Sequence, residues 1–364
     1  MKLFFYLLFA LFYWLYRLLP VAPKAVFIHT HDQGMGGNIG AVYHAFHLQN
    51  MVSSYHRISR EDYRTPCRIL MFFLVKSYHL ATARFVFLDN VFLPLAFIRF
   101  RQGVKVIQLW HGSGSVKKFG QHVNTGLLRW LERRANQAYT HLIVNSRKMV
   151  PMYSGAFGVS EKITYPIGLP RTDALWNRQM VKRNSHDFRK QFSEIGTRKI
   201  ILYAPTFRDG STEQEIKLNL DLMMNELQEA YVLLIRLHPH IAKAARKIHF
   251  SNKFIIDVSF YQDLNTLLAS ADILITDYSS IIYEFAIMQK PMIFYPYDIN
   301  EFRRGFYYEY ESYVPGPIVF STQELITVIR DGRYEQKKLE RFVSEHYDYQ
   351  DGRATERLLD ILKI

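Results

Sequence analysis

His111 and Gly112 stand where an apolar, strand-like run at 104–110 ends, and Lys117 follows shortly after. Glycine permits a tight turn and lets a ligand approach the backbone closely. Because a histidine side chain titrates near neutral pH, one that leaves a strand into such a loop is suited to act as a general base. A histidine that only caps its strand by a hydrogen bond gives the same pattern, so both interpretations stay open.

Three strand-like runs of the second half also end in polar residues. The candidates are Thr206 and Arg208 after the run at 199–205, Arg236 and His238 at the end of the run at 232–237, and Asp277, Ser279, Ser280 and Glu284 after the run at 273–276. Small hydroxyl residues at the start of a helix predict a phosphate site, because free backbone N–H groups and the positive end of the helix dipole face the anion. Ordinary N-capping by Ser279 or Ser280 is the competing interpretation.

Asp277 and Glu284 differ from these candidates in their negative charge. Asp277 would repel a phosphate group, so we expect it to bind a hydroxyl group or to orient His238. Glu284 is expected to accept a hydrogen bond from a ribose or polyol hydroxyl, or else to face solvent.

All these candidates depend on strands whose carboxyl ends meet at one edge of a sheet. Apolar runs predict strands at 25–30, 84–89, 104–110, 141–145, 199–205, 232–237, 254–257, 273–276 and 291–297. Helices are expected between them, most clearly at 41–49, 126–139, 263–271 and 280–289. Strands that alternate with helices predict an α/β fold of two Rossmann-like domains with parallel sheets.

The polar stretch at 172–199 interrupts this alternation and is predicted to contain the interdomain linker and its flanking helices. We therefore expect a membrane-associating helix at 1–22, one domain at 23–172, a second domain at 173–345, and a C-terminal helix at 346–364 that packs back on the protein. The sequence has no GxSxG elbow, no P-loop and no cluster at metal-ligand spacing, so we expect neither a metal nor a cofactor.

The chain of 364 residues carries 46 Lys and Arg against 33 Asp and Glu, a net charge of +13. This excess favours an anionic partner: nucleic acid, acidic lipid or a phosphorylated substrate. No long basic run, zinc-finger spacing or RNA-binding motif is present, so nucleic acid is the least supported of the three. The single cysteine, Cys67, excludes an internal disulfide framework.

The first twenty residues are unusually rich in aromatic and aliphatic side chains, with no charge between Lys2 and Arg17. This run is shorter than the ~20 residues that cross a bilayer upright. On a helix, Lys2, Tyr6, Tyr13 and Arg17 fall on one face and the rest is mostly apolar. The pattern predicts a helix in the membrane interface, with an uncleaved anchor or a helix docked on the protein's own core as alternatives.

Seven segments, in this order, resemble the CDP-glycerol glycerophosphotransferase family of teichoic acid synthesis. They are 108–112 with Lys117 and Gly120, 168–173, 203–208, 236–239, 271–280, 304–306 and 349–354. The resemblance implies a GT-B-type arrangement of two domains, with CDP-glycerol or CDP-ribitol as the donor. It adds Gly168 and Arg171 to the donor-binding set and places Gly112 and Lys117 on the acceptor side.

The resemblance also implies a lipid-linked acceptor at the cytoplasmic face of the cell membrane, such as the undecaprenyl-diphosphate-linked disaccharide on which a primase acts. We expect an acceptor hydroxyl to attack the β-phosphorus of CDP-glycerol while CMP leaves. His111 would take the proton, and His238 would help to hold the diphosphate. A GT-B glycosyltransferase that uses a nucleotide sugar, and a lipid-binding protein with a decayed site, are the alternatives.

Overall fold

The computed structural model describes residues 2–30, 36–48, 54–206, 208, 216–237, 253–302 and 305–363. The chain divides into two compact units. The N-terminal unit contains Met1–Ser113, Lys118–Asp173 and Tyr347–Ile364, and the C-terminal unit contains Gly114–Lys117 and Ala174–His346. The division after Asp173 lies next to the expected boundary at 172, whereas segment 114–117, expected in the first domain, groups with the C-terminal unit.

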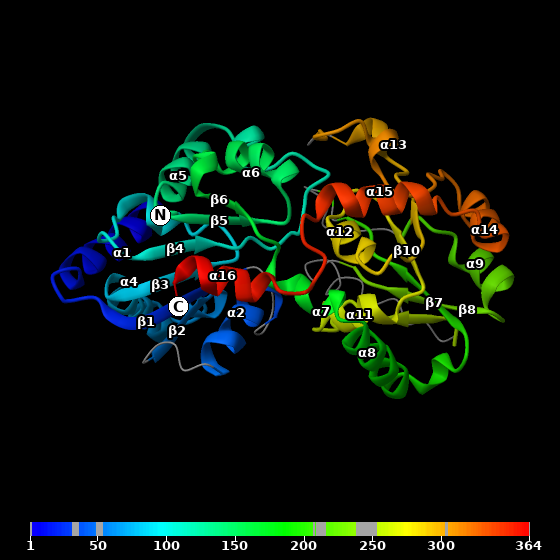
Figure 1. The fold of residues 1–364 in the computed structure, drawn as a ribbon, viewed down its shortest axis with the longest axis horizontal. Helices are drawn as coiled ribbons and strands as arrows, with labels where there is room; N and C mark the ends of the chain where they lie inside the picture. The colour runs from blue at the N-terminus through cyan, green and yellow to red at the C-terminus, as the bar shows by residue number, and fades with distance from the viewer. Residues whose placement is uncertain are drawn as a thin grey trace. The chain divides into compact units, whose positions relative to one another are not determined.

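The N-terminal unit is built on a parallel sheet in the order β2-β1-β3-β4-β5-β6 (Figure 1). Its strands are β1 (Ala22–His29), β2 (Ser54–Ser59), β3 (Ala83–Leu88), β4 (Lys105–Gln108), β5 (His141–Val144) and β6 (Thr164–Pro166). The four strands predicted in this half are confirmed and form the centre of the sheet. β2 and β6 were not predicted; both are edge strands and lack a continuous apolar run.

Helices cover this sheet on both faces, as crossover connections of parallel strands require. They are α1 (Lys2–Tyr16), α2 (Gly37–Leu48), α3 (Pro66–Met71), a π-helical turn (Phe72–Lys76), α4 (Ser77–Ala81), α5 (Gly126–Asn136), α6 (Val150–Phe157) and α16 (Ala354–Leu362). α16, at the red end of the chain in Figure 1, packs beside α2. Its Leu358 and Leu362 join the same core as Phe27 and Val42.

α1 is docked on the N-terminal unit through one face. Phe9 and Tyr13 are buried, and Phe9 stacks on Phe72 with a ring distance of 4.6 Å. The Tyr13 hydroxyl and the Arg17 guanidinium both donate to the Arg99 carbonyl, at 3.0 Å each. The expected polar face of the helix thus turns partly inward, because its long side chains find backbone acceptors on the protein.

The C-terminal unit has a five-stranded parallel sheet in the order β11-β10-β7-β8-β9. Its strands are β7 (Lys199–Tyr203), β8 (Tyr231–Ile235), β9 (Ile255–Asp257), β10 (Ile273–Thr276) and β11 (Met292–Phe294). All five were predicted and are confirmed. Two helices, α7 (Asp173–Trp176) and α8 (Arg178–Gln191), occupy most of the stretch predicted to contain the linker and its flanking helices.

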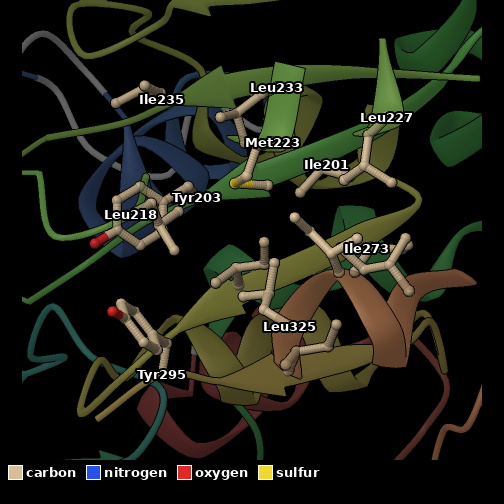
Figure 2. Packing of buried hydrophobic residues seen from close by; sticks show 14 of the residues in the cluster. Ile201, Tyr203, Leu218, Met223, Leu227, Leu233, Ile235, Ile273, Tyr295 and Leu325 are labelled. Carbon is tan, nitrogen blue, oxygen red and sulfur yellow. The ribbon is translucent and has the colours of Figure 1, made fainter. Parts of the chain in front are cut away.

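The remaining helices of the C-terminal unit are α9 (Leu220–Leu227), α11 (Leu264–Ser270), α12 (Ile281–Ala286), α13 (Tyr310–Tyr313), α14 (Thr322–Asp331) and α15 (Gln336–His346). The apolar sides of α9 and α14 pack on one face of the sheet (Figure 2). There Met223 and Leu325 meet Ile201, Leu233 and Ile273 from three strands. This core holds the strand ends described below in fixed positions.

Candidate active site

The sheet of the N-terminal unit has a topological switch point between β1 and β3. There the strand order reverses, because β2 lies on one side of β1 and all later strands lie on the other. Ligands of open α/β sheets bind beyond the carboxyl ends of the strands at such a switch point. His29, at the end of β1, lies 3.3 Å from the carboxylate of Asp89, which follows β3. Asp89 also accepts from the Thr30 backbone N–H at 2.9 Å.

His111 lies at the end of the next strand and is held by the same residue. Its Nδ1 is 3.1 Å from the backbone carbonyl of Asp89. A carbonyl can only accept, so Nδ1 carries the proton and Nε2 is the basic nitrogen of the neutral ring. The capping interpretation predicts this bond too. The ring is therefore held in the tautomer that a general base needs, and the bond alone assigns no chemistry to it.

The backbone before His111 is strained. Trp110 has a φ of +58°, in the left-handed region that a non-glycine residue seldom adopts. Asn38 donates to the carbonyls of Leu109 and Trp110 at 3.1 and 2.9 Å, and the Gln108 side chain accepts from the Trp110 N–H at 2.9 Å. Strain that surrounding contacts maintain in this way is typical of functional sites.

Two residues expected to bind the donor belong to the N-terminal unit. Arg171 is buried; its guanidinium donates to the His111 carbonyl and its backbone N–H donates to Asn38 at 3.0 Å. Gly168 has a φ of +87°, and a Cβ there would meet the Cβ of Ala354 at 3.0 Å. Arg171 thus supports the His111 loop, and Gly168 lies against the start of α16. The donor-binding role of both residues remains a prediction.

The two residues expected on the acceptor side lie on either side of Gly114. The Gly112 carbonyl accepts from the Tyr153 hydroxyl at 3.2 Å within the N-terminal unit. Lys117 forms an antiparallel bridge with Phe306 in the C-terminal unit. A methyl group on Gly114 would lie 2.3 Å from the Tyr283 ring, so only glycine fits there.

The sheet of the C-terminal unit also has a switch point, between β7 and β10. The strand ends are joined there, because Asp277 accepts from the Thr206 backbone N–H at 2.8 Å and from the Tyr278 N–H at 2.6 Å. Asp277 is buried. The sequence prediction that these strand ends lie together is thus confirmed by the hydrogen bonds.

Arg208 completes this cluster with two carboxylates. Its guanidinium lies 2.8 Å from Asp277 and donates to both oxygens of Asp298, at 2.6 and 2.8 Å. The Tyr278 and Tyr297 rings lie 4.9 and 5.0 Å from it. Arg208 therefore offsets part of the negative charge of the two carboxylates. Orientation of His238 by Asp277 is untested, because His238 lies outside the described residues.

Arg236 follows β8 at the same edge of the sheet. Its guanidinium donates to the Tyr261 carbonyl at 2.8 Å and lies 3.4 Å from that of Val258. These bonds direct the side chain toward the residues after β9.

Ser279 and Ser280 begin α12, as predicted. The Ser279 hydroxyl accepts from the Ile281 N–H at 3.3 Å, so it makes the contact that the capping interpretation expects. Ser280 is the N-cap residue without a side-chain cap bond and is half-buried. Glu284 is buried, and the expectation that it might instead face solvent is wrong.

Three positioning residues were not predicted from the sequence: Asn38, Asp89 and Asp298. Asp89 ends a predicted strand next to that of His111, a placement that a strand-order prediction would have used. Asn38 lies in the first turn of α2, and Asp298 has no local pattern. Among the described residues, no group of three or more His, Cys, Asp or Glu side chains is arranged to hold a metal ion.

The family model described as CDP-Glycerol:Poly(glycerophosphate) glycerophosphotransferase matches residues 11–363. The chain belongs to this family. Among its relatives, the teichoic acid poly(ribitol-phosphate) polymerase of Bacillus spizizenii is 30% identical, over 97% of this chain and 58% of the relative. The teichoic acid glycerol-phosphate primase of Bacillus subtilis is 34% identical, over 80% of this chain and 76% of the relative. The chain thus spans little more than half the length of the first of these glycerophosphotransferase relatives.

A solved structure of the wall teichoic acid polymerase TagF has the same fold as this member of the glycerophosphotransferase family. The two chains superpose with a TM-score of 0.82 at 24% identity, over 98% of this chain and 93% of the other. At that identity the likeness concerns the fold alone.

Proposed function

We propose that this protein transfers glycerol phosphate from CDP-glycerol to a hydroxyl group of a lipid-linked saccharide or glycerol-phosphate acceptor and releases CMP, in the synthesis of teichoic acid or a related cell-surface polymer. The observation that carries the proposal is the family match over residues 11–363. The relatives named above are teichoic acid primases and polymerases. The GT-B-type arrangement stays a prediction.

The donor diphosphate is assigned to the carboxyl edge of the C-terminal sheet. Thr206 and Asp277 meet at its switch point, and Arg208 and Arg236 supply positive charge there. Ser280, which has no side-chain cap bond, adds a hydroxyl donor at the start of α12. We assign Glu284 and Asp277 to hydroxyl groups of the nucleoside or polyol, and His238 to the diphosphate.

His111 is assigned as the general base. The acceptor oxygen forms a bond to the β-phosphorus while the bond from that phosphorus to the CMP oxygen breaks. His111 Nε2 takes the acceptor proton. The Asp89 carbonyl holds Nδ1 at 3.1 Å, and this fixes the tautomer. Phosphoryl transfer depends mainly on positioning and on electrostatic stabilisation of the phosphate oxygens, which the cationic groups provide.

A membrane surface is assigned to α1. The helix exposes a row of large apolar side chains: Leu3, Phe4, Leu7, Leu11, Trp14 and Leu15. No helix among the described residues is long and apolar enough to cross a bilayer. An amphipathic helix that exposes such a row is suited to the interfacial region of a membrane, where a lipid-linked acceptor is found. We propose the cytoplasmic face as its location.

Ribitol phosphate is the second candidate group, because the polymerase of Bacillus spizizenii that is 30% identical is named for poly(ribitol-phosphate). Separate incubations with CDP-glycerol, with CDP-ribitol and with UDP-sugars, each with a lipid-linked acceptor, distinguish the candidates by which donor releases its nucleotide. CMP release from a CDP-polyol is expected. Release of UDP alone would favour the glycosyltransferase, and no release would favour the lipid-binding protein.

The role of His111 has its own test. His111→Ala is expected to lower the transfer rate by about 10²–10⁴, the usual cost of losing a general base. His186→Ala, at an exposed position on α8, is the matched control. A His111→Ala protein that transfers at the control's rate would remove His111 from the mechanism.

A further inference from the structure

A polar hollow of about 230 Å³ lies beside the end of the edge strand β2, which β1 and β3 separate from the strand β4 that precedes His111. It is bounded by the end of β2, the turn that follows it, α3 and the π-helical turn. The lining residues are Arg57, Ser59, Glu61, Asp62, Arg68, Met71 and Lys76. A hollow of this volume is several times larger than the ~30 Å³ that one water molecule occupies in the liquid.

The cations of this hollow are loosely paired with its carboxylates, although Lys76 also donates to the backbone carbonyl of Arg57. Arg68 is 3.7 Å from Glu61 and Lys76 is 3.7 Å from Asp62, both longer than the 2.7–2.9 Å of a charge-assisted hydrogen bond. Within the described part of the chain, the buried Nε of Arg57 has no hydrogen-bond partner. Leaving such a donor unsatisfied is costly, and a ligand oxygen would remove that cost.

The charges favour an anion. Three cations face two carboxylates, and Asp62 is already bound to the Ser59 backbone N–H at 2.7 Å, so it serves to hold the turn. Two guanidinium groups in one hollow suit a phosphate, because each presents several N–H groups in a plane that matches phosphate oxygens.

Apolar surface adjoins the hollow. Leu70 and Met71 of α3 are exposed. On the other side of the same segment, Phe5 of α1 packs against Tyr63 and Phe73 at ring distances of 5.7 and 4.7 Å. α1 therefore packs, through Phe5, on the segment that bounds the hollow. A ligand that fits both features has a phosphate head and an apolar chain.

We propose that this hollow binds the phosphate or diphosphate head of a lipid. The proposal rests on the membrane association of α1 proposed above, but not on the transfer reaction. Two sources share this chemistry: a lipid-linked diphosphate, as in the proposed acceptor, and the head group of a bulk anionic lipid.

The test measures binding of the full chain, without any nucleotide, to phosphatidylcholine vesicles that contain a polyprenyl diphosphate, to vesicles that contain phosphatidylglycerol at equal charge, and to inorganic pyrophosphate in solution. Arg68→Gln is expected to weaken binding to at least one of the two vesicle types by about tenfold, the loss of one charge-assisted contact. The vesicle type whose binding Arg68→Gln weakens identifies which of the two lipids the hollow binds. If Arg68→Gln weakens the binding of inorganic pyrophosphate as much as it weakens vesicle binding, the assignment to a lipid is wrong.

Glu61→Gln distinguishes a binding role from a structural one. It removes the acid that competes for Arg68, so vesicle binding is expected to tighten, whereas simple damage to the turn would weaken it. Arg183→Gln, an equal loss of charge at an exposed position on α8, is the control. Because no step involves CMP release, the transfer proposal and this one fail separately. Equal effects of Arg68→Gln and Arg183→Gln would overturn the proposal.

Discussion

At the scale of single residues, Asp277 determines the geometry of the C-terminal site. Its carboxylate accepts from the backbone after β7, and it is paired with Arg208. Its own carbonyl accepts from the Tyr310 hydroxyl at 2.9 Å. A buried carboxylate requires such partners, because without them the cost of removing its charge from water would destabilise the fold.

Asp277→Asn is expected to lower the free energy of unfolding by about 1.5–3 kcal/mol, since the hydrogen bond to a charged partner is lost. Asp331→Asn, which removes an acid of the exposed pair with Arg333, is the control and should cost no more than ~1 kcal/mol. Urea unfolding of both variants measures the difference. Equal losses would show that the Asp277 network adds no more than a surface ion pair.

His79 gives the N-terminal unit a pH dependence. Its ring stacks on that of His56 at 3.4 Å, and Lys24 lies 3.4 Å from its Nδ1. Burial, followed by the nearby charges of His56, Lys24 and Lys76, lowers the pKa of His79 from 6.5 to about 4. The folded protein therefore binds fewer protons than the unfolded chain between these pH values.

The stabilisation that follows is present above pH 6.5 and is lost as the pH falls toward 4, because unfolding then takes up a proton. His79→Phe keeps an aromatic ring beside His56 but cannot be protonated. Its free energy of unfolding is expected to fall less between pH 7 and pH 4.5 than that of the unaltered protein. Denaturant titrations at several pH values measure this, with His186→Phe as the control. Parallel curves for all three proteins would exclude the stacked pair as the cause.

The residue types of the site could be predicted from the sequence, but their partners could not. That polar residues follow β4, β7, β8 and β10 required only a strand pattern and the rule that ligands gather at strand ends. The bond from His111 to Asp89 and the pairing of Arg208 with Asp298 depend on the order of strands and on loop paths. Arg171 shows the limit most clearly, because a residue expected to bind the donor supports the His111 loop instead.

At the scale of elements, α1 has two apolar faces, one packed on the N-terminal unit and one exposed. The inner face, with Phe9, packs on Phe72 and Phe92, at ring distances of 4.6 and 5.8 Å. The outer face, with Phe4, is exposed. The sequence predicted the helix and its apolar character. Docking of Tyr13 could not be predicted, because it depends on a carbonyl that is 86 residues away in the chain.

This difference predicts opposite effects for two similar substitutions. Phe9→Ala is expected to destabilise the protein by about 3–5 kcal/mol, the usual cost of removing a buried aromatic ring. Phe4→Ala, at a side chain that is 71% exposed, should change stability by less than ~0.5 kcal/mol and weaken vesicle binding. Thermal unfolding and vesicle sedimentation give the two readouts. Unchanged vesicle binding in Phe4→Ala would contradict a membrane role for this face.

The strands of the two sheets show which elements a pattern can identify. Buried strands such as β10 are continuous apolar runs, and all nine predicted strands exist. β2 carries Tyr55, His56 and Arg57, and β6 is only three residues long. An edge strand pairs on one side and need not be apolar throughout, so the sequences of β2 and β6 resemble those of loops. The edge strands β9 and β11 were predicted because their segments keep an apolar run.

At the scale of the whole molecule, two sheets each present a switch point with polar residues, and a family match spans nearly the entire chain. The C-terminal segment returns to the N-terminal unit, where Asp173 accepts from the backbone of Ala354 and Thr355 at 2.9 Å each. α16 therefore contributes to the N-terminal core although it follows the whole C-terminal unit.

The central proposal is that this chain transfers glycerol phosphate and releases CMP. The most direct measurement is the mass of a defined lipid-linked disaccharide after incubation with CDP-glycerol, together with the amount of CMP formed. We predict a product heavier by one or more glycerol phosphate units, with one CMP released for each. An acceptor whose mass is unchanged, or one that gains a sugar from a nucleotide sugar instead, would contradict the account.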